Sequence, residues 1–177
     1  MSGVSVSKSG PNAGMRMSQD ARARMRVTEK AVFRYYNDMG KNRGNCTWGA
    51  GILAHKGVCS QEELERKVSA TMVDQEFERR VAEAERYVRA IVRVSVNQAQ
   101  FDSLVSLTYN AGVGGMEDTY RLVNRGDFSG AAENISKMIK VSIKEKGKKK
   151  LVVARGLIKR REEESAPFRV TSNPSTK

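Results

Sequence analysis

The chain has 177 residues, the length of one ordinary domain and enough to bury a stable core. Lysine and arginine outnumber acidic residues by 32 to 20, which gives a formal net charge of +12. Such a charge favours a polyanionic partner, and nucleic acid, anionic lipid and the bacterial cell wall all qualify. No apolar run approaches the roughly 18 residues of a membrane span, and the N-terminus lacks the apolar core of a signal peptide. The sequence therefore predicts a protein made in the cytoplasm, with no transmembrane segment.

The two ends of the chain are expected to be flexible around one compact domain. Residues 1–17 are rich in Ser, Gly and Asn and are predicted to form a loosely held lead-in, and residues 169–177 a flexible tail. The domain between them, residues 18–168, begins with Ser18, a residue type that caps helices well. A helix is predicted from there to Tyr36, ending in the turn-forming sequence NDMG.

Two carboxyl groups and a hydroxyl group fall within one short segment. Glu29 lies in the predicted helix and Asp38 in its exit turn, with eight residues between them. Thr47 opens the glycine-rich sequence CTWGAGIL, which predicts a short strand. Carboxyl groups on different elements can differ in pKa, so that one acts as an acid and the other as a base, as glycoside hydrolysis requires. With 20 acidic residues in the chain, the spacing alone favours two solvated surface acids.

The order of these residues resembles a known pattern. Glu29 is followed by Tyr36 two residues before Asp38, and then by Thr47-x-Gly-x-Gly. This resembles the catalytic segment of the bacteriophage-type lysozymes, family 24 of the glycoside hydrolases. The resemblance extends over residues 18–165 and includes three further segments in the same order, residues 97–112, 119–132 and 156–164. The chain departs from the family at Lys30, where glycine is common, and in a longer loop before Thr47.

The resemblance implies a fold and a reaction. The fold would be mainly α, an α+β lysozyme-like arrangement of two lobes joined by a long helix, with a small β-hairpin region in the N-terminal lobe and a break near Glu29. The reaction would be hydrolysis of the β-1,4 bond between N-acetylmuramic acid and N-acetylglucosamine. Glu29 would be the general acid, while Asp38 and Thr47 would position and activate a water for single displacement with inversion. No cofactor is implied.

The resemblance also implies substrate contacts and partners. Tyr36 and Trp48 adjoin the catalytic residues, and Thr108, Tyr109 and Asn110 are expected to line the cleft and bond sugar hydroxyls or amides. Tyr109 fits a packed core position equally well. The partner would be peptidoglycan in the periplasm. The protein would act as a monomer, and an export or injection apparatus would deliver it. An immunity protein is a further candidate partner.

The two cysteines, Cys46 and Cys59, flank the predicted hairpin TWGAGILAHKG. An even count at this spacing permits a disulfide without establishing one. The single histidine, His55, fits a surface position in the hairpin. Two cysteines and one histidine are too few for a convincing zinc site, so metal catalysis is not expected.

The rest of the chain is predicted to be helical. Ser60 and Glu63 form a capping box that opens one long amphipathic run ending at Ile91. Asn97 with Gln100 caps the next helix, which is predicted to stop at Gly112. A short helix is expected at residues 119–124, and Asp127 is expected to cap another that runs toward Met138.

The densest positive charge lies in residues 137–161, where eleven lysines or arginines accompany one acid, Glu145. This stretch is expected to hold the anionic wall and steer encounter with it. It contains no aromatic residue for base stacking, which disfavours nucleic acid as the partner. Arg160 and Arg161 are expected to form local helix pairs with Glu162–Glu164, each contributing little.

Two other functions are compatible with the sequence. A lytic transglycosylase would need one acid, Glu29, and would release anhydro-muramic products. A non-catalytic cell-wall or nucleic-acid-binding protein would depend on the basic stretch, and its binding would weaken steeply with salt. The combination of Glu29, Asp38 and Thr47 favours the hydrolase. A phage lysis enzyme, a phage tail component and an antibacterial effector would share this chemistry.

Overall fold

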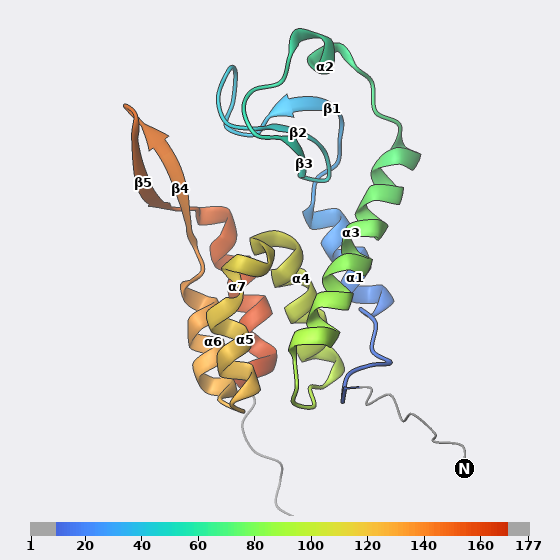
Figure 1. The fold of residues 1–177 in the computed structure, drawn as a ribbon, viewed down its shortest axis with the longest axis vertical. Coiled ribbons are helices and arrows are strands. Elements are labelled where there is room, and N and C mark those ends of the chain that lie inside the picture. Colours follow the sequence, from blue (N-terminus) through green and yellow to red (C-terminus); the bar gives the residue numbers. More distant parts are fainter. Residues whose placement is uncertain (1–9, 170–177) are drawn as a thin grey trace, which may run out of the picture. The chain divides into compact units, whose positions relative to one another are not determined.

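The computed structural model describes residues 10–169, which form seven helices and two antiparallel sheets (Figure 1). The described chain divides into two compact units, one of residues 18–83 and one of residues 10–17 with residues 84–169. The boundary falls within α3 (Ala70–Ile91), so this helix contributes to both units. The prediction of a mainly helical α+β fold with a small β region and a long connecting helix is confirmed. No helix in residues 10–169 is both long enough and apolar enough to cross a bilayer.

The first helix, α1 (Gln19–Thr28), is fixed at its start and along one face. The Ser18 hydroxyl accepts a hydrogen bond from the Ala21 backbone amide at 3.2 Å, which confirms the predicted cap. Arg26 pairs with Asp74 of α3 at 2.6 Å, and its guanidinium lies 5.7 Å from the centre of the Phe77 ring. These contacts hold α1 against the first half of α3, within residues 18–83.

The segment after α1 is a strand, so the prediction of a helix through Tyr36 is wrong. β1 (Val32–Asn37) pairs with β2 (Cys46–Gly49), and β2 pairs with β3 (Ile52–His55), all antiparallel. The sequence VFRYYN is rich in β-branched and aromatic residues, which pack well on a pleated sheet. Pairing with β2 therefore outweighs the helical continuation from α1. The short strand predicted in CTWGAGIL is confirmed as β2 with the start of β3.

The amphipathic run after Ser60 is two helices and not one. The predicted capping box of Ser60 and Glu63 is present and opens α2 (Gln61–Glu65). The chain then leaves the helix, and the Val68 amide donates to the Phe33 carbonyl at 3.2 Å beside a bridge between Arg34 and Lys67. This pairing with the edge of β1 competes with helical hydrogen bonding. Helix α3 begins only after this interruption.

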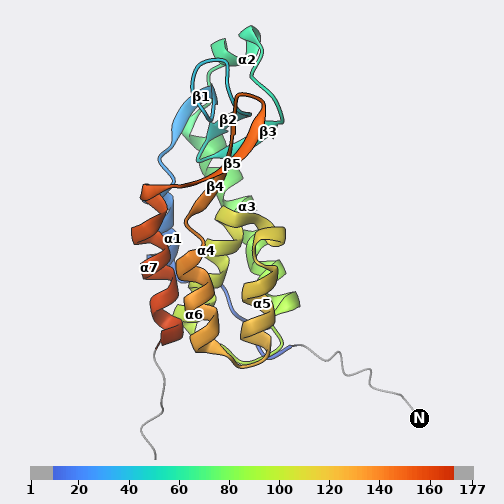
Figure 2. The same cartoon turned by 90° about the vertical axis from the view of Figure 1, so that its left-hand side faces the viewer.

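The second unit is a cluster of helices: α4 (Gln98–Gly115), α5 (Glu117–Asn124), α6 (Phe128–Lys137) and α7 (Arg155–Arg169) (Figure 2). The predicted capping box of Asn97 with Gln100 is present, and the Asp127 carboxylate accepts from the Gly130 amide at 2.8 Å. Gly112 has a φ of 72°, so the helical conformation of α4 is interrupted where the sequence predicts a stop. The core contains fully buried large side chains of these helices: Phe101, Leu104, Leu107, Ile135 and Phe168.

Residues 10–17 are packed against this helical unit, which differs from the expected loose lead-in. Asn12 is 1% exposed, and its amide group donates to the carbonyls of Val94 at 2.8 Å and Val92 at 3.3 Å. Its side-chain oxygen accepts from the Val96 amide at 3.2 Å. One polar side chain thereby satisfies three backbone groups of the loop after α3. Residues 1–9 and 170–177 lie outside the described residues.

A β-hairpin occupies part of the basic stretch, for which no strand is predicted from the sequence. β4 (Lys140–Glu145) and β5 (Lys148–Val153) pair in full register around a two-residue turn at Lys146 and Gly147. The hairpin stands away from α5, α6 and α7 (Figure 1). The segments VSI and LVV favour strand formation, but the surrounding lysines conceal this signal in the sequence.

Arg161 on α7 is the centre of a buried polar network, so the expectation of weak surface pairs is wrong for this residue. Arg161 is 2% exposed, and its Nε donates to the Met138 carbonyl at 2.9 Å. Its guanidinium also pairs with Glu164, whose carboxylate accepts from the Ser106 hydroxyl at 2.6 Å. The remaining guanidinium nitrogen donates to the Asn110 side chain of α4. The network ties α7 to α4 and to the end of α6.

Replacing Arg161 should destabilise the fold strongly, because the Met138 carbonyl and the Asn110 side chain would lose a buried donor. Glu164 would keep a single cationic partner, Arg160, at 3.1 Å. We expect Arg161→Met to lower the free energy of unfolding by about 3 kcal/mol in urea denaturation. Lys159→Met is the matched control on the same helix. Lys159 is 87% exposed, and its contact with Glu163 is long, at 3.8 Å. This substitution should lower the free energy of unfolding by less than about 1 kcal/mol. Equal losses in the two variants would contradict a buried network.

Candidate active site

Glu29 lies at the junction between α1 and β1. It is the C-cap of α1, where its backbone amide donates to the Met25 carbonyl at 2.8 Å and its backbone leaves the helical conformation. A Cβ atom placed on Gly51 would lie 3.6 Å from Glu29 Oε2. The carboxylate therefore lies beside the turn between β2 and β3.

Asp38 lies at the other end of β1 and closes the loop of residues 38–45. Its amide donates to the Asn45 carbonyl at 3.1 Å, and its Oδ1 accepts from the Asn45 amide at 2.8 Å. A Cβ on Gly44, whose φ is +83°, would lie only 1.9 Å from Asp38 Oδ1. Glycine at position 44 is thus required for the carboxylate to occupy this exposed position.

Tyr36 connects the two carboxylates electrostatically. Burial raises the pKa of its phenol above the usual range, and the negative charges of Asp38 and then Glu29 raise it further. Both carboxylates are therefore close enough to act on one phenol within the unit of residues 18–83. The phenol stays protonated at neutral pH, so it can donate a hydrogen bond.

Thr47 lies opposite Tyr36 in the pairing of β1 with β2. Its side chain is buried, and its hydroxyl donates to the Asn45 carbonyl at 3.3 Å. Asn45 therefore bonds both Asp38 and Thr47, and its side-chain oxygen accepts from the Gly57 amide at 3.0 Å. Asn45 does not stand out in the sequence, because asparagine in a polar glycine-containing loop is typical of any turn.

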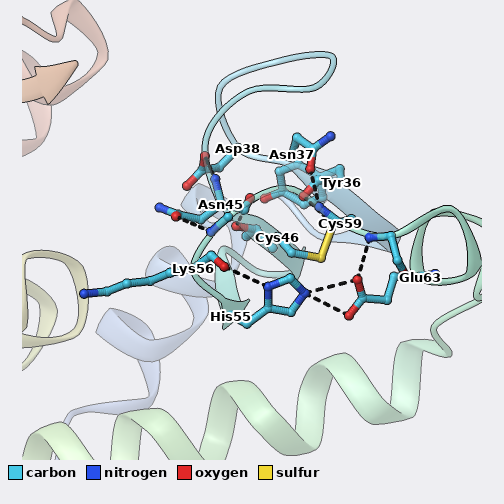
Figure 3. Close-up of a disulfide and its surroundings, with 12 residues drawn as sticks. Tyr36, Asn37, Asp38, Asn45, Cys46, His55, Lys56, Cys59 and Glu63 are labelled. Carbon is cyan, nitrogen blue, oxygen red and sulfur yellow. Dashed lines mark hydrogen bonds and ion pairs between the residues drawn. A yellow bond between two sulfur atoms is a disulfide. The ribbon is translucent and has the colours of Figure 1, made fainter. Parts of the chain in front are cut away.

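Cys46 and Cys59 form a disulfide directly beside these residues (Figure 3). Cys46 precedes Thr47 in β2, and the Cys59 amide donates to the side-chain oxygen of Asn37 at 2.8 Å. The bond thus ties the strand that carries Thr47 to the residue that precedes Asp38. The Glu63 carboxylate lies within 4.8 Å of both sulfurs, but sulfurs joined in a disulfide offer no thiolate to a metal.

His55 connects β3 to α2. Its Nε2 lies 2.9 Å from Glu63 Oε1 and its Nδ1 lies 3.0 Å from the Lys56 carbonyl (Figure 3). The pKa of His55 is raised, first by the bond to the Lys56 carbonyl and then by the bond to Glu63. The pKa of Glu63 is lowered, first by the Ser60 amide and then by His55. This exposed pair braces the sheet against the start of α2.

Trp48 belongs to an aromatic pair. Its ring stacks on Tyr35 with 6.0 Å between centroids and 27° between planes, and Arg66 lies 5.5 Å from the centre of the Tyr35 ring. Tyr35 and Trp48 are partners in the β1–β2 ladder. Because side chains alternate along a strand, this pair projects from the opposite face to Tyr36 and Thr47.

The remaining predicted substrate residues lie on α4, in the other unit. Thr108 is buried, and its hydroxyl donates to the Leu104 carbonyl at 2.7 Å and shares a hydrogen bond with the Tyr120 hydroxyl. The Asn110 side chain accepts from Arg161. Tyr109 is half-buried on the same helix. Thr108 and Asn110 therefore bond side chains of their own unit.

The unit of residues 18–83 thus gathers Glu29, Asp38, Tyr36 and Thr47 around the junctions of its sheet. A cluster with two carboxyl groups in unlike surroundings can divide acid and base roles between them. One carboxyl group faces a glycine turn, and the other is hydrogen-bonded in an exposed loop. The cluster can therefore perform general acid–base chemistry on a neutral, polar substrate.

The chain resembles known proteins in sequence and in fold. Residues 27–164 match the family model described as phage lysozyme, and this range includes all four clustered residues. The chain is 37% identical over 100 residues to an endolysin of Bacillus phage B103. That match spans 50% of this chain and 35% of the endolysin, so the chain aligns with about a third of that protein's length.

Solved structures show the same fold. An endolysin from Escherichia coli O157:H7 phage FAHEc1 superposes with a TM-score of 0.68 at 28% identity, covering 92% of this chain and 98% of that one. The muramidase domain of SpmX from Asticaccaulis excentricus gives a TM-score of 0.65 at 24% identity, covering 88% and 99% of the two chains. Since the family model matches residues 27–164, far more than half of the chain, the protein belongs to the phage lysozyme family.

Proposed function

We propose that the protein is a muramidase that hydrolyses the β-1,4 bond between N-acetylmuramic acid and N-acetylglucosamine in bacterial peptidoglycan. The observation that carries the proposal is the arrangement of Glu29 before β1 and Asp38 directly after it, with Tyr36 paired to Thr47 between the strands. Membership of the phage lysozyme family supports it, as does similarity to two proteins named endolysins. The formal net charge of +12 suits an anionic cell wall.

In this proposal Glu29 is the general acid that protonates the leaving glycosidic oxygen. Its carboxylate lies beside Gly51, at the turn between β2 and β3. Tyr36 donates a hydrogen bond near the carboxylates. Trp48, Thr108, Tyr109 and Asn110 are further candidates for contact with the glycan.

Asp38 and Thr47 hold and activate the attacking water. Asn45 fixes both side chains, since it bonds the Asp38 carboxylate through its amide and the Thr47 hydroxyl through its carbonyl. Direct attack by this water inverts the anomeric centre, and requires about 6.5–9.5 Å between the two carboxyl groups to leave room for it. The enzyme would act as a monomer on the cell wall in the periplasm. An export or injection apparatus would deliver it there, and an immunity protein is a candidate partner.

Glu29→Gln should abolish the reaction, because glutamine cannot donate the proton. We expect a loss of about a thousandfold or more in the rate of fragment release from purified peptidoglycan, measured by mass spectrometry. Glu62→Gln is the matched control in the same unit, since Glu62 is 87% exposed on α2, and it should retain activity. An active Glu29→Gln variant would exclude this residue as the acid.

Asp38→Asn distinguishes the hydrolase from a lytic transglycosylase. Asparagine keeps a side-chain oxygen that accepts from the Asn45 amide, so the loop should be preserved. For the hydrolase we expect a loss of about a hundredfold or more, with reducing muramic ends from the wild type. Full activity in Asp38→Asn, together with anhydro-muramic ends, would assign the protein to the transglycosylases.

The geometry of the cluster can be tested without substrate through the pKa of Tyr36. In ultraviolet difference titration against Tyr36→Phe, the wild-type phenol should titrate above its usual range. Asp38→Asn should lower this pKa, and Glu29→Gln should lower it less, because Asp38 has the larger effect. Burial should keep the pKa elevated in both variants, and Glu62→Gln should leave it unchanged. If neither variant moved it, the two carboxylates would not share a site with Tyr36.

A further inference from the structure

The β4–β5 hairpin leaves one of its faces open. Residues paired across two antiparallel strands project from the same face, so Lys140 with Val153 and Ser142 with Leu151 define one face, which Lys149 continues. All five of these residues are exposed. The opposite face includes Ile143 and Val152, which are half-buried. The face that carries Lys140, Ser142, Lys149, Leu151 and Val153 is the open face of the hairpin.

The open face carries aliphatic side chains that water solvates poorly. Leu151 is 68% exposed and Val153 is 48% exposed. A two-stranded ribbon alone is marginally stable in water, and each exposed aliphatic side chain forgoes the gain of burial. The open face therefore suits a partner that offers an apolar layer.

Positive charge surrounds these aliphatic residues. Lys140 lies on the open face, and the other end of the hairpin carries four lysines around a surface hollow: Lys146, Lys148, Lys149 and Lys150. A partner complementary to this surface must place an apolar layer directly beneath a layer of negative charge. Nucleic acid presents charge without such a layer, and the hairpin has no aromatic side chain on which bases could stack.

We propose that the β4–β5 hairpin docks on the surface of an anionic phospholipid bilayer. Leu151 and Val153 enter the boundary between headgroups and acyl chains, and the lysines contact lipid phosphates. This docking is independent of the proposed hydrolysis, because its surface shares no residue with the cluster around Tyr36. It would hold the protein at a bacterial membrane, next to the wall.

Co-sedimentation with vesicles tests the proposal using the full chain. Vesicles of one part phosphatidylglycerol to three parts phosphatidylcholine should bind the protein at about 150 mM salt, and pure phosphatidylcholine vesicles should not. Lys140→Gln with Lys149→Gln, both on the open face, should weaken binding about 30-fold, since each lysine near an anionic surface contributes about a fivefold factor. Leu151→Ser should weaken it about tenfold, because an inserted leucine is lost.

The matched control removes equal charge from helices of the same unit. Lys137→Gln with Lys159→Gln should change binding less than about threefold, because both lysines already pair with glutamates, Lys137 with Glu133 at 2.6 Å and Lys159 with Glu163 at 3.8 Å. Circular dichroism of each variant confirms that it is folded. The proposal is overturned by absence of binding to anionic vesicles, by an equal loss in the control, or by unchanged binding of Leu151→Ser. Unchanged lipid binding in all hairpin variants, with loss of duplex DNA binding, would assign the surface to nucleic acid.

Discussion

The candidate site depends above all on the antiparallel pairing of β1 with β2. This pairing sets Tyr36 opposite Thr47 and Asn37 opposite Cys46, so that Asp38 emerges from the sheet next to the strand that carries Thr47. The disulfide from Cys46 to Cys59 and the hydrogen bond from Cys59 to Asn37 fix the same end of the sheet. A slip of one residue would turn every side chain of β1 to the other face and separate Tyr36 from Thr47.

The sequence predicts the local features of this fold well. Ser18, Ser60, Asn97 and Asp127 all cap helices as expected, because a cap is decided by a side chain and an amide a few residues away. The strand β1 was missed, since its pairing partner lies in a later segment and the preceding helix masks its aromatic pattern. Asn45 was missed for a similar reason, as its role arises only when β1 and β2 meet.

Charge was the least informative feature of the sequence. Lys159 and Arg161 lie in one basic stretch, yet Lys159 is 87% exposed, whereas Arg161 is almost wholly buried and bonds α4 and the end of α6. Earlier in the same stretch, lysines surround exposed aliphatic residues of the β4–β5 hairpin. A run of cations therefore contains residues with unlike roles, and only the packing of α7 and the register of β4 with β5 distinguish them.

The anomeric configuration of the first product tests the central claim most directly. Proton nuclear magnetic resonance of a short chitin-like or peptidoglycan oligosaccharide, followed from the first minutes of cleavage, distinguishes the two anomers before they equilibrate. Water held by Asp38 and Thr47 and a proton from Glu29 predict that the α-anomer forms first, by inversion. Early formation of the β-anomer, or of a 1,6-anhydro product, would contradict this account of the site.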